Sequence, residues 1–106
     1  MNNKYSVIYS PQARADIRAI YTYIRDELKE PKTARDQSVR IRETIKSLDS
    51  FPERHTLVDW EPWQSLGMRK MPIDNYIIFY LTDKENQIVR IIRILYAGRN
   101  IEKILK

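Results

Sequence analysis

A pair of strand-forming segments near the C-terminus constrains the fold of this chain most. Residues 76–82 and 88–97 are rich in isoleucine, leucine and tyrosine, and β-branched and aromatic side chains favour strands. Residues 83–87, which separate them, are all polar and have a length suited to a hairpin connection. We therefore expect these two segments to form neighbouring antiparallel strands.

Both faces of this strand pair are largely apolar. In a regular strand, alternation gives residues 88–97 two faces, one with Ile88, Arg90, Ile92, Ile94 and Tyr96, the other with Val89, Ile91, Arg93 and Leu95. The preceding strand alternates in the same way, with Tyr76, Ile78 and Tyr80 opposite Ile77, Phe79 and Leu81. Helices can cover only one face, so sheet curvature, residues 57–65 or another protein must close the other. Because a permanently exposed apolar face promotes aggregation, we expect a protein partner there.

The N-terminal half predicts one strand and two helices. Residues 5–9 suit a short strand, and Ser10 followed by Pro11 is a typical helix start. Apolar residues then recur at helical spacing in two stretches separated by Pro31. The first stretch contains Ala13, Ile17, Ile20, Ile24 and Leu28, and the second contains Ala34, Ser38, Ile41, Ile45 and Leu48. The charged residues of the second stretch, Arg35 and Arg42 among them, are expected on its solvated face.

These elements, with a further strand at residues 68–73, predict an α+β fold. The expected order is β-α-α-β-β-β, an antiparallel sheet with a two-helix hairpin packed on one face, in a single domain spanning residues 1–106. Residues 57–65 are expected to be irregular, with Trp60 and Trp63 covering the edge of the core and their indole N–H groups near water or a carbonyl. Residues 100–106 are expected to form one or two helical turns.

Composition excludes several kinds of chemistry. The chain has no cysteine and a single histidine, His55, so thiolate sites and transition-metal sites are not expected, nor is any cofactor. His55 follows Pro-Glu-Arg and is expected at the surface. No apolar run approaches the roughly 18 to 20 residues of a membrane span, and the N-terminus lacks the apolar segment of a secretion signal. We expect a cytoplasmic protein without membrane contact.

Positive charge is concentrated in the strand-rich C-terminal part. Residues 66–106 contain eight lysines and arginines against four acids, which gives +4 of the net charge of +5. A basic sheet favours an anionic partner such as nucleic acid, a ribosome or an acidic protein. The alternative is a basic domain that binds no polyanion specifically.

Several segments together resemble the RelE/ParE superfamily of bacterial type II toxins. They are Tyr-Ser-Val-Ile-Tyr-Ser-Pro-Gln-Ala at residues 5–13 with Asp16 and Ile17 close behind, the turn at residues 47–54, the strands at 68–72 and 76–80, and Ile-Leu-Tyr-Ala-Gly-Arg-Asn-Ile-Glu at residues 94–102. The resemblance implies a growth-inhibiting toxin in a hetero-oligomer with a cognate antitoxin, which neutralises the toxin with an amphipathic segment. It also implies one of two targets: DNA gyrase for ParE-type members, or mRNA in the ribosome for RelE-type members.

The resemblance also assigns candidate residues. Arg69, Lys70 and Arg99 fall where RelE-like toxins carry catalytic basic residues, which would stabilise the anionic phosphate during metal-free RNA cleavage. Tyr96 is a candidate acid, with ordinary packing in the sheet as the alternative. Arg90 and Arg93 are candidate target-binding residues; in a regular strand they point to opposite faces, so only one of them can join Arg99.

Two departures favour ParE over RelE. RelE-like toxins carry an arginine where this chain has Ile77, and they end in a catalytic tyrosine or a His-Tyr pair where this chain offers only Leu105. The favoured hypothesis is therefore an inhibitor of DNA gyrase that performs no chemistry of its own. A ribosome-dependent mRNA endonuclease is the alternative, and a non-toxic nucleic-acid-binding module is a third.

Overall fold

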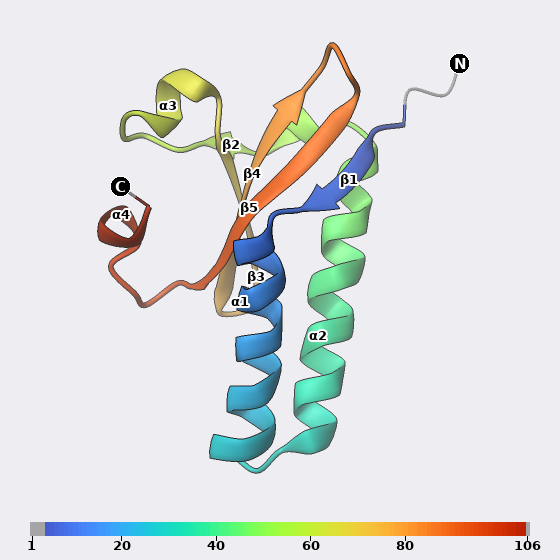
Figure 1. The fold of residues 1–106 in the computed structure, drawn as a ribbon, viewed down its shortest axis with the longest axis vertical. Coiled ribbons are helices and arrows are strands. Elements are labelled where there is room, and N and C mark those ends of the chain that lie inside the picture. Colours follow the sequence, from blue (N-terminus) through green and yellow to red (C-terminus); the bar gives the residue numbers. More distant parts are fainter. Residues whose placement is uncertain (1–3, 106) are drawn as a thin grey trace.

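The computed structural model describes residues 4–105 and contains a five-stranded sheet with a helical hairpin (Figure 1). The main elements are β1 (Ser6–Tyr9), α1 (Pro11–Thr22), α2 (Pro31–Lys46), β2 (Thr56–Leu57), β3 (Arg69–Ile73), β4 (Tyr76–Asp83) and β5 (Ile88–Tyr96). Single helical turns form α3 (Trp63–Leu66) and α4 (Ile101–Ile104). The α+β class and the two-helix hairpin on one face of the sheet are confirmed.

The sheet has the order β1-β5-β4-β3-β2. Strands β2 to β5 pair antiparallel, with the expected hairpin between β4 and β5, but β1 lies parallel to β5 with Ser6 opposite Ile88. The sheet is thus mixed rather than wholly antiparallel. A parallel neighbour requires a long connection, which here runs from α1 to β4. The two-residue strand β2 was not predicted, because Thr56 and Leu57 are too short a pair to give a pattern.

The start of α1 follows from Ser10 and Pro11, as predicted. The Ser10 hydroxyl accepts a hydrogen bond from the Ala13 amide at 2.9 Å and donates one to the Ile92 carbonyl at 2.8 Å. After Thr22 the helix widens into a π-helical turn, Tyr23–Glu27, in which the Leu28 amide bonds the Tyr23 carbonyl. This wider turn interrupts the 3.6-residue periodicity. Leu28, expected on the apolar face, is consequently half exposed.

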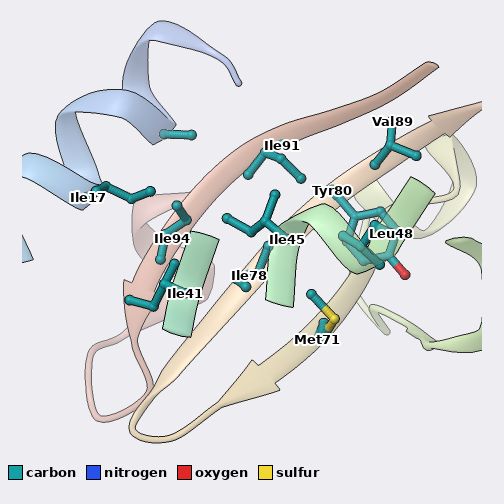
Figure 2. Close-up of a cluster of buried hydrophobic side chains, with 11 residues drawn as sticks. Ile17, Ile41, Ile45, Leu48, Met71, Ile78, Tyr80, Val89, Ile91 and Ile94 are labelled. Atoms are coloured by element: carbon teal, nitrogen blue, oxygen red, sulfur yellow. The ribbon is translucent and has the colours of Figure 1, made fainter. Parts of the chain in front are cut away.

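The larger core lies between the helical hairpin and the sheet (Figure 2). Ile17 of α1 and Ile41 and Ile45 of α2 pack against Ile78 of β4 and Ile91 of β5. All five side chains are almost fully buried. We call this cluster the helix-side core. Its helical members come from the apolar stripes predicted for both helices, and their burial fixes the hairpin on the sheet.

The opposite face of the sheet is covered by the chain itself. Val58 and Met68 pack there against Phe79 and Leu95, together with Leu105 beyond α4. Helices α3 and α4 lie on this side of the sheet, away from α1 and α2 (Figure 1). The expectation that a partner protein covers this face is therefore wrong for most of it. This face is instead covered by the segment around residues 57–65, as the sequence allowed, together with the turn α4.

A bulge in β5 breaks its alternation. Phe79 pairs with Arg93 and Tyr80 pairs with Ile91, so Ile92 has no partner on β4. An extra residue in one strand shifts every later side chain to the other face. Ile91 and Ile94 consequently share the helix-side core, although regular alternation assigns them to opposite faces. The two-face assignment predicted for β5 is thus wrong beyond Ile92, whereas the one for β4 is confirmed.

Beyond β1, the edge of β5 is closed by α1. The Asp16 carboxylate accepts a hydrogen bond from the Ile94 amide at 2.9 Å and two from the Arg93 guanidinium at 2.7 and 3.0 Å. Both side chains are largely buried. Asp16 therefore satisfies an amide that would otherwise be left open at the sheet edge. Within residues 4–105, no helix has the length and apolar character needed to span a membrane.

Candidate functional site

A basic groove of about 790 Å³ is formed by α1, α2 and the end of β1. Each helix contributes four side chains with the spacing i, i+3, i+4 and i+7, which places them on one face. From α1 come Arg14, Ile17, Arg18 and Tyr21, from α2 come Arg35, Ser38, Val39 and Arg42, and β1 adds Tyr9. The lining combines four arginines with an aromatic and aliphatic floor and contains no acidic residue.

The charge of this groove is not neutralised within the part of the chain that the structure describes. No carboxylate among residues 4–105 forms an ion pair with Arg14, Arg18, Arg35 or Arg42. Burial raises the pKa of the Tyr9 hydroxyl, while the nearby charges of Arg42 and Arg14 act to lower it. Two of the arginines thus converge on Tyr9 from different helices. The groove can bind a negatively charged partner that also carries apolar groups.

Sequence reasoning missed this groove. It assigned Arg35 and Arg42 to a solvated helix face and attached no role to Arg14 or Arg18. The groove could have been predicted from the sequence, because arginines recur with the spacing i, i+4 or i+7 on both predicted helices of one hairpin. Because the helices lie side by side, two such stripes face one shared groove.

The two basic residues predicted on β3 point in opposite directions. Arg69 pairs with Tyr80 and its guanidinium donates to the His55 carbonyl at 2.6 Å, with Glu53 at 3.9 Å. Lys70 pairs with Phe79 on the other face and lines a small pocket of about 150 Å³ beside α4, with Trp60 and Asn100 among its neighbours. Arg69 therefore supports the β2 loop, and only Lys70 faces a cavity.

Tyr96 and Arg99 lie together at the end of β5. The Tyr96 side chain is half exposed, and its ring meets that of Tyr76 edge to face at 6.0 Å. The Arg99 amide donates to the Tyr96 carbonyl at 3.1 Å and its side chain is exposed. An added Cβ at Gly98 would lie 2.6 Å from the Tyr96 ring, so any other residue there would require the tyrosine ring to move.

The four candidate catalytic residues do not all converge on one point. Tyr96 pairs with Tyr76 at the start of β4, whereas Arg69 pairs with Tyr80 four residues later. Lys70 lies on the face opposite to Arg69. The structure therefore brings Tyr96 and Arg99 into one turn and places Lys70 in a pocket with Asn100, the next residue, but it separates Arg69 from this turn.

The two candidate target-binding arginines have different surroundings. Arg93 is held by Asp16, whose hydrogen bonds raise the pKa of the guanidinium, while Arg90 is exposed. The bulge pairs Arg90 with Leu81 and Arg93 with Phe79, two residues apart on β4. The regular-strand expectation of opposite faces therefore does not apply. Of the two, only Arg90 presents a cation at the surface.

His55 and the two tryptophans are packed rather than free. His55 was expected at the surface but is partly buried, with its ring 6.4 Å from that of Tyr80 and its Nε2 atom enclosed without a partner among the described residues. The indole of Trp63 donates to the Leu105 carbonyl, as predicted, whereas the Trp60 indole N–H is buried and has no hydrogen-bond acceptor among residues 4–105. Burial raises the pKa of Tyr80, whose hydroxyl donates to the Pro52 carbonyl, to about 12.

The environment of His55 makes folding stability depend on pH. Burial lowers the pKa of His55, and the charges of Arg54 and Arg69 lower it further. Below about pH 6.5 the unfolded chain therefore binds a proton that the folded protein does not, so stability is full above this pH and decreases as the pH falls. We expect the urea midpoint of the wild type to fall between pH 7.5 and 5.5 more steeply than that of a His55→Gln variant. Equal slopes would contradict this assignment.

The described part of the chain offers no metal site. No group of three or more histidine, aspartate or glutamate side chains among residues 4–105 is arranged to hold a metal ion.

Comparison with solved structures places the fold in a class of bacterial toxins. The chain is similar to a chromosomal ParDE toxin–antitoxin protein from Pseudomonas aeruginosa, with a TM-score of 0.74 and 21% identity over 91% of this chain and 99% of that one. It is also similar to a chain of the RelBE2 complex of Mycobacterium tuberculosis (TM-score 0.63, 19% identity, 88% and 98% covered) and to isolated RelE of Escherichia coli (0.55, 16%, 95% and 94%). The fold is that of RelE/ParE toxins.

The sequence identifies the family within this class. Residues 7–101 match the profile of the ParE toxin of the type II toxin-antitoxin system parDE, and the chain therefore belongs to the ParE toxin family. It is a toxin of a type II toxin–antitoxin system. No curated protein sequence matches the chain significantly.

Proposed function

We propose that this toxin inhibits bacterial growth by binding DNA gyrase and performs no chemical step itself. The observation that carries the proposal is the dispersal of the candidate catalytic residues. Arg69 is held by the His55 carbonyl, and Lys70 faces the other side of the sheet. General acid–base cleavage of RNA requires its groups within hydrogen-bonding reach of one phosphate. Membership of the ParE family supports the same target, which requires a cytoplasmic location.

We further propose that the cognate antitoxin binds in the basic groove between α1 and α2. The groove combines unneutralised arginines with an apolar floor, which fits an acidic amphipathic segment. An amphipathic segment laid into a groove is a common mode of peptide recognition. The similarity to proteins solved as toxin–antitoxin complexes supports a protein partner of this kind.

Purified toxin distinguishes gyrase inhibition from RNA cleavage. We expect it to block gyrase supercoiling of a relaxed plasmid and to leave mRNA intact in a translating extract. An Arg69→Ala, Arg99→Ala double variant serves as the matched test, because it removes two of the three phosphate-binding candidates without touching the groove. The mRNA in an extract that contains this variant should be as intact as in one that contains the wild type. Unimpaired supercoiling at a large excess of toxin, together with mRNA cut in the wild type and spared by the double variant, would establish the endonuclease instead.

A further inference from the structure

We propose that Phe51 is an aromatic anchor with which the toxin engages an apolar pocket on its protein target. The Phe51 side chain is 82% exposed, more than any other large hydrophobic residue among those described. Its backbone adopts the left-handed conformation, with φ 48° and ψ 54°. The inference rests on the proposed function only for the identity of the target.

A phenylalanine is unfavourable both at so exposed a position and in a left-handed backbone conformation. The left-handed region is strained for any residue with a Cβ and suits glycine or asparagine, and a bulky residue there is an outlier. The other non-glycine residues with positive φ in the described chain are Lys29, Asp74 and Gln87, all of them polar. Strained residues of this kind cluster at functional sites, where the surrounding structure holds them in place.

The loop around Phe51 is held firmly. The Arg54 guanidinium donates to the Phe51 carbonyl and to the Ser47 hydroxyl, each at 3.2 Å, and also to the Ser50 carbonyl. On the other side, the buried Pro52 accepts a hydrogen bond from the Tyr80 hydroxyl through its carbonyl. The ring therefore projects from a fixed backbone, which lowers the entropy lost when a partner immobilises it.

The charges near Phe51 favour a protein over a nucleic acid. A base-stacking platform combines its aromatic ring with cations that follow the phosphate backbone. Here Arg54 is occupied by carbonyl groups, and Lys84 forms an ion pair with Glu53 at 3.0 Å. Asp49 adds a second acid, paired with Lys4 at 3.7 Å. The charges around Phe51 thus largely balance, and aromatic residues are enriched and charged residues depleted at the core of protein interfaces.

Phe51 does not line the basic groove. The antitoxin proposed for the groove and the target proposed for Phe51 can therefore be separated by mutation. A substitution at Phe51 should affect growth inhibition and leave antitoxin binding unchanged.

The decisive variant is Phe51→Asn, because asparagine relieves the backbone strain and removes the ring. We expect its melting temperature to equal that of the wild type or exceed it by about 3 to 6 °C. We expect the intracellular level of toxin needed to stop growth to rise by about tenfold or more. Its affinity for the antitoxin encoded beside the toxin should stay within about threefold of the wild-type value, since the ring lies outside the groove.

Three variants control this result. Lys29→Asn relieves the same kind of strain at an exposed site, and Leu66→Asn removes a comparably exposed apolar side chain; neither should reduce growth inhibition. Phe51→Ala removes the ring while keeping a Cβ and should show the same loss as Phe51→Asn, so the test does not depend on one variant folding.

Full growth inhibition by either folded Phe51 variant would overturn the proposal, and so would an equal loss of antitoxin affinity. If the wild type fails to inhibit gyrase, the proposed target is wrong. The growth comparison still decides the role of Phe51, because it requires no assumption about which protein is bound.

Discussion

Replacing both Arg18 and Arg42 with glutamate is expected to weaken antitoxin binding by about a hundredfold or more, equivalent to about 3 kcal/mol. The two residues line the basic groove from α1 and α2. Neither forms an ion pair within residues 4–105. The double substitution changes the charge of the groove by four units and places two carboxylates opposite an acidic partner segment, without removing an internal ion pair. Titration calorimetry of the purified toxin with its antitoxin measures the effect directly.

A matched pair of substitutions distinguishes the effect of charge inside the groove from the effect of the protein's net charge. Arg90→Glu together with Lys103→Glu changes the net charge by the same amount at exposed positions outside the groove. This control should lose only the part of the affinity that long-range attraction supplies, and that part should disappear at high salt. If control and groove variants lose affinity equally, the antitoxin does not bind in the groove.

Asp16→Ala is expected to lower the free energy of unfolding by about 2 to 4 kcal/mol. The substitution leaves the partly buried Arg93 guanidinium without its carboxylate and the Ile94 amide without an acceptor. Asp16 is 13% exposed and Arg93 23% exposed, so water can replace these bonds only in part. Urea denaturation followed by circular dichroism measures the loss.

The exposed ion pair between Lys32 and Asp36 provides the comparison for Asp16. It has a similar bond length of 2.9 Å but lies on the open surface of α2. Asp36→Ala should leave the urea midpoint essentially unchanged, because solvated pairs contribute little to stability. A comparable loss for both variants would show that burial at the edge of β5 is not what makes Asp16 important.

Local sequence patterns predicted the helices and the central hairpin well. The apolar stripe of α2 and the capping pair Ser10 and Pro11 specify structure within a few residues, and no distant contact overrides them. The polar connection at residues 83–87 similarly sets the β4–β5 hairpin. These features depend only on neighbours along the chain or across one turn.

The features that sequence reasoning missed depend on distant contacts. The bulge at Ile92 lies where β5 passes from β1 to α1 as its edge neighbour, which no local pattern records. The covering of the outer face requires Leu105 to return to Phe79 across the sheet. The basic groove likewise exists only because two separate helices align their arginines. The family resemblance selected Arg69 as a candidate residue, but it could not reveal that the Arg69 guanidinium donates a hydrogen bond to the His55 carbonyl.

The parallel pairing of β1 with β5 has a consequence for the toxin during its own synthesis. Residues 6–9 are synthesised well before their partners, residues 88–91. Contacts so distant in sequence form late, because the loop between them must close first. The helical hairpin can form earlier, but the sheet edge that Asp16 closes does not exist until β5 has been made. A nascent chain that has not yet reached β5, or a chain truncated before it, therefore lacks a complete sheet.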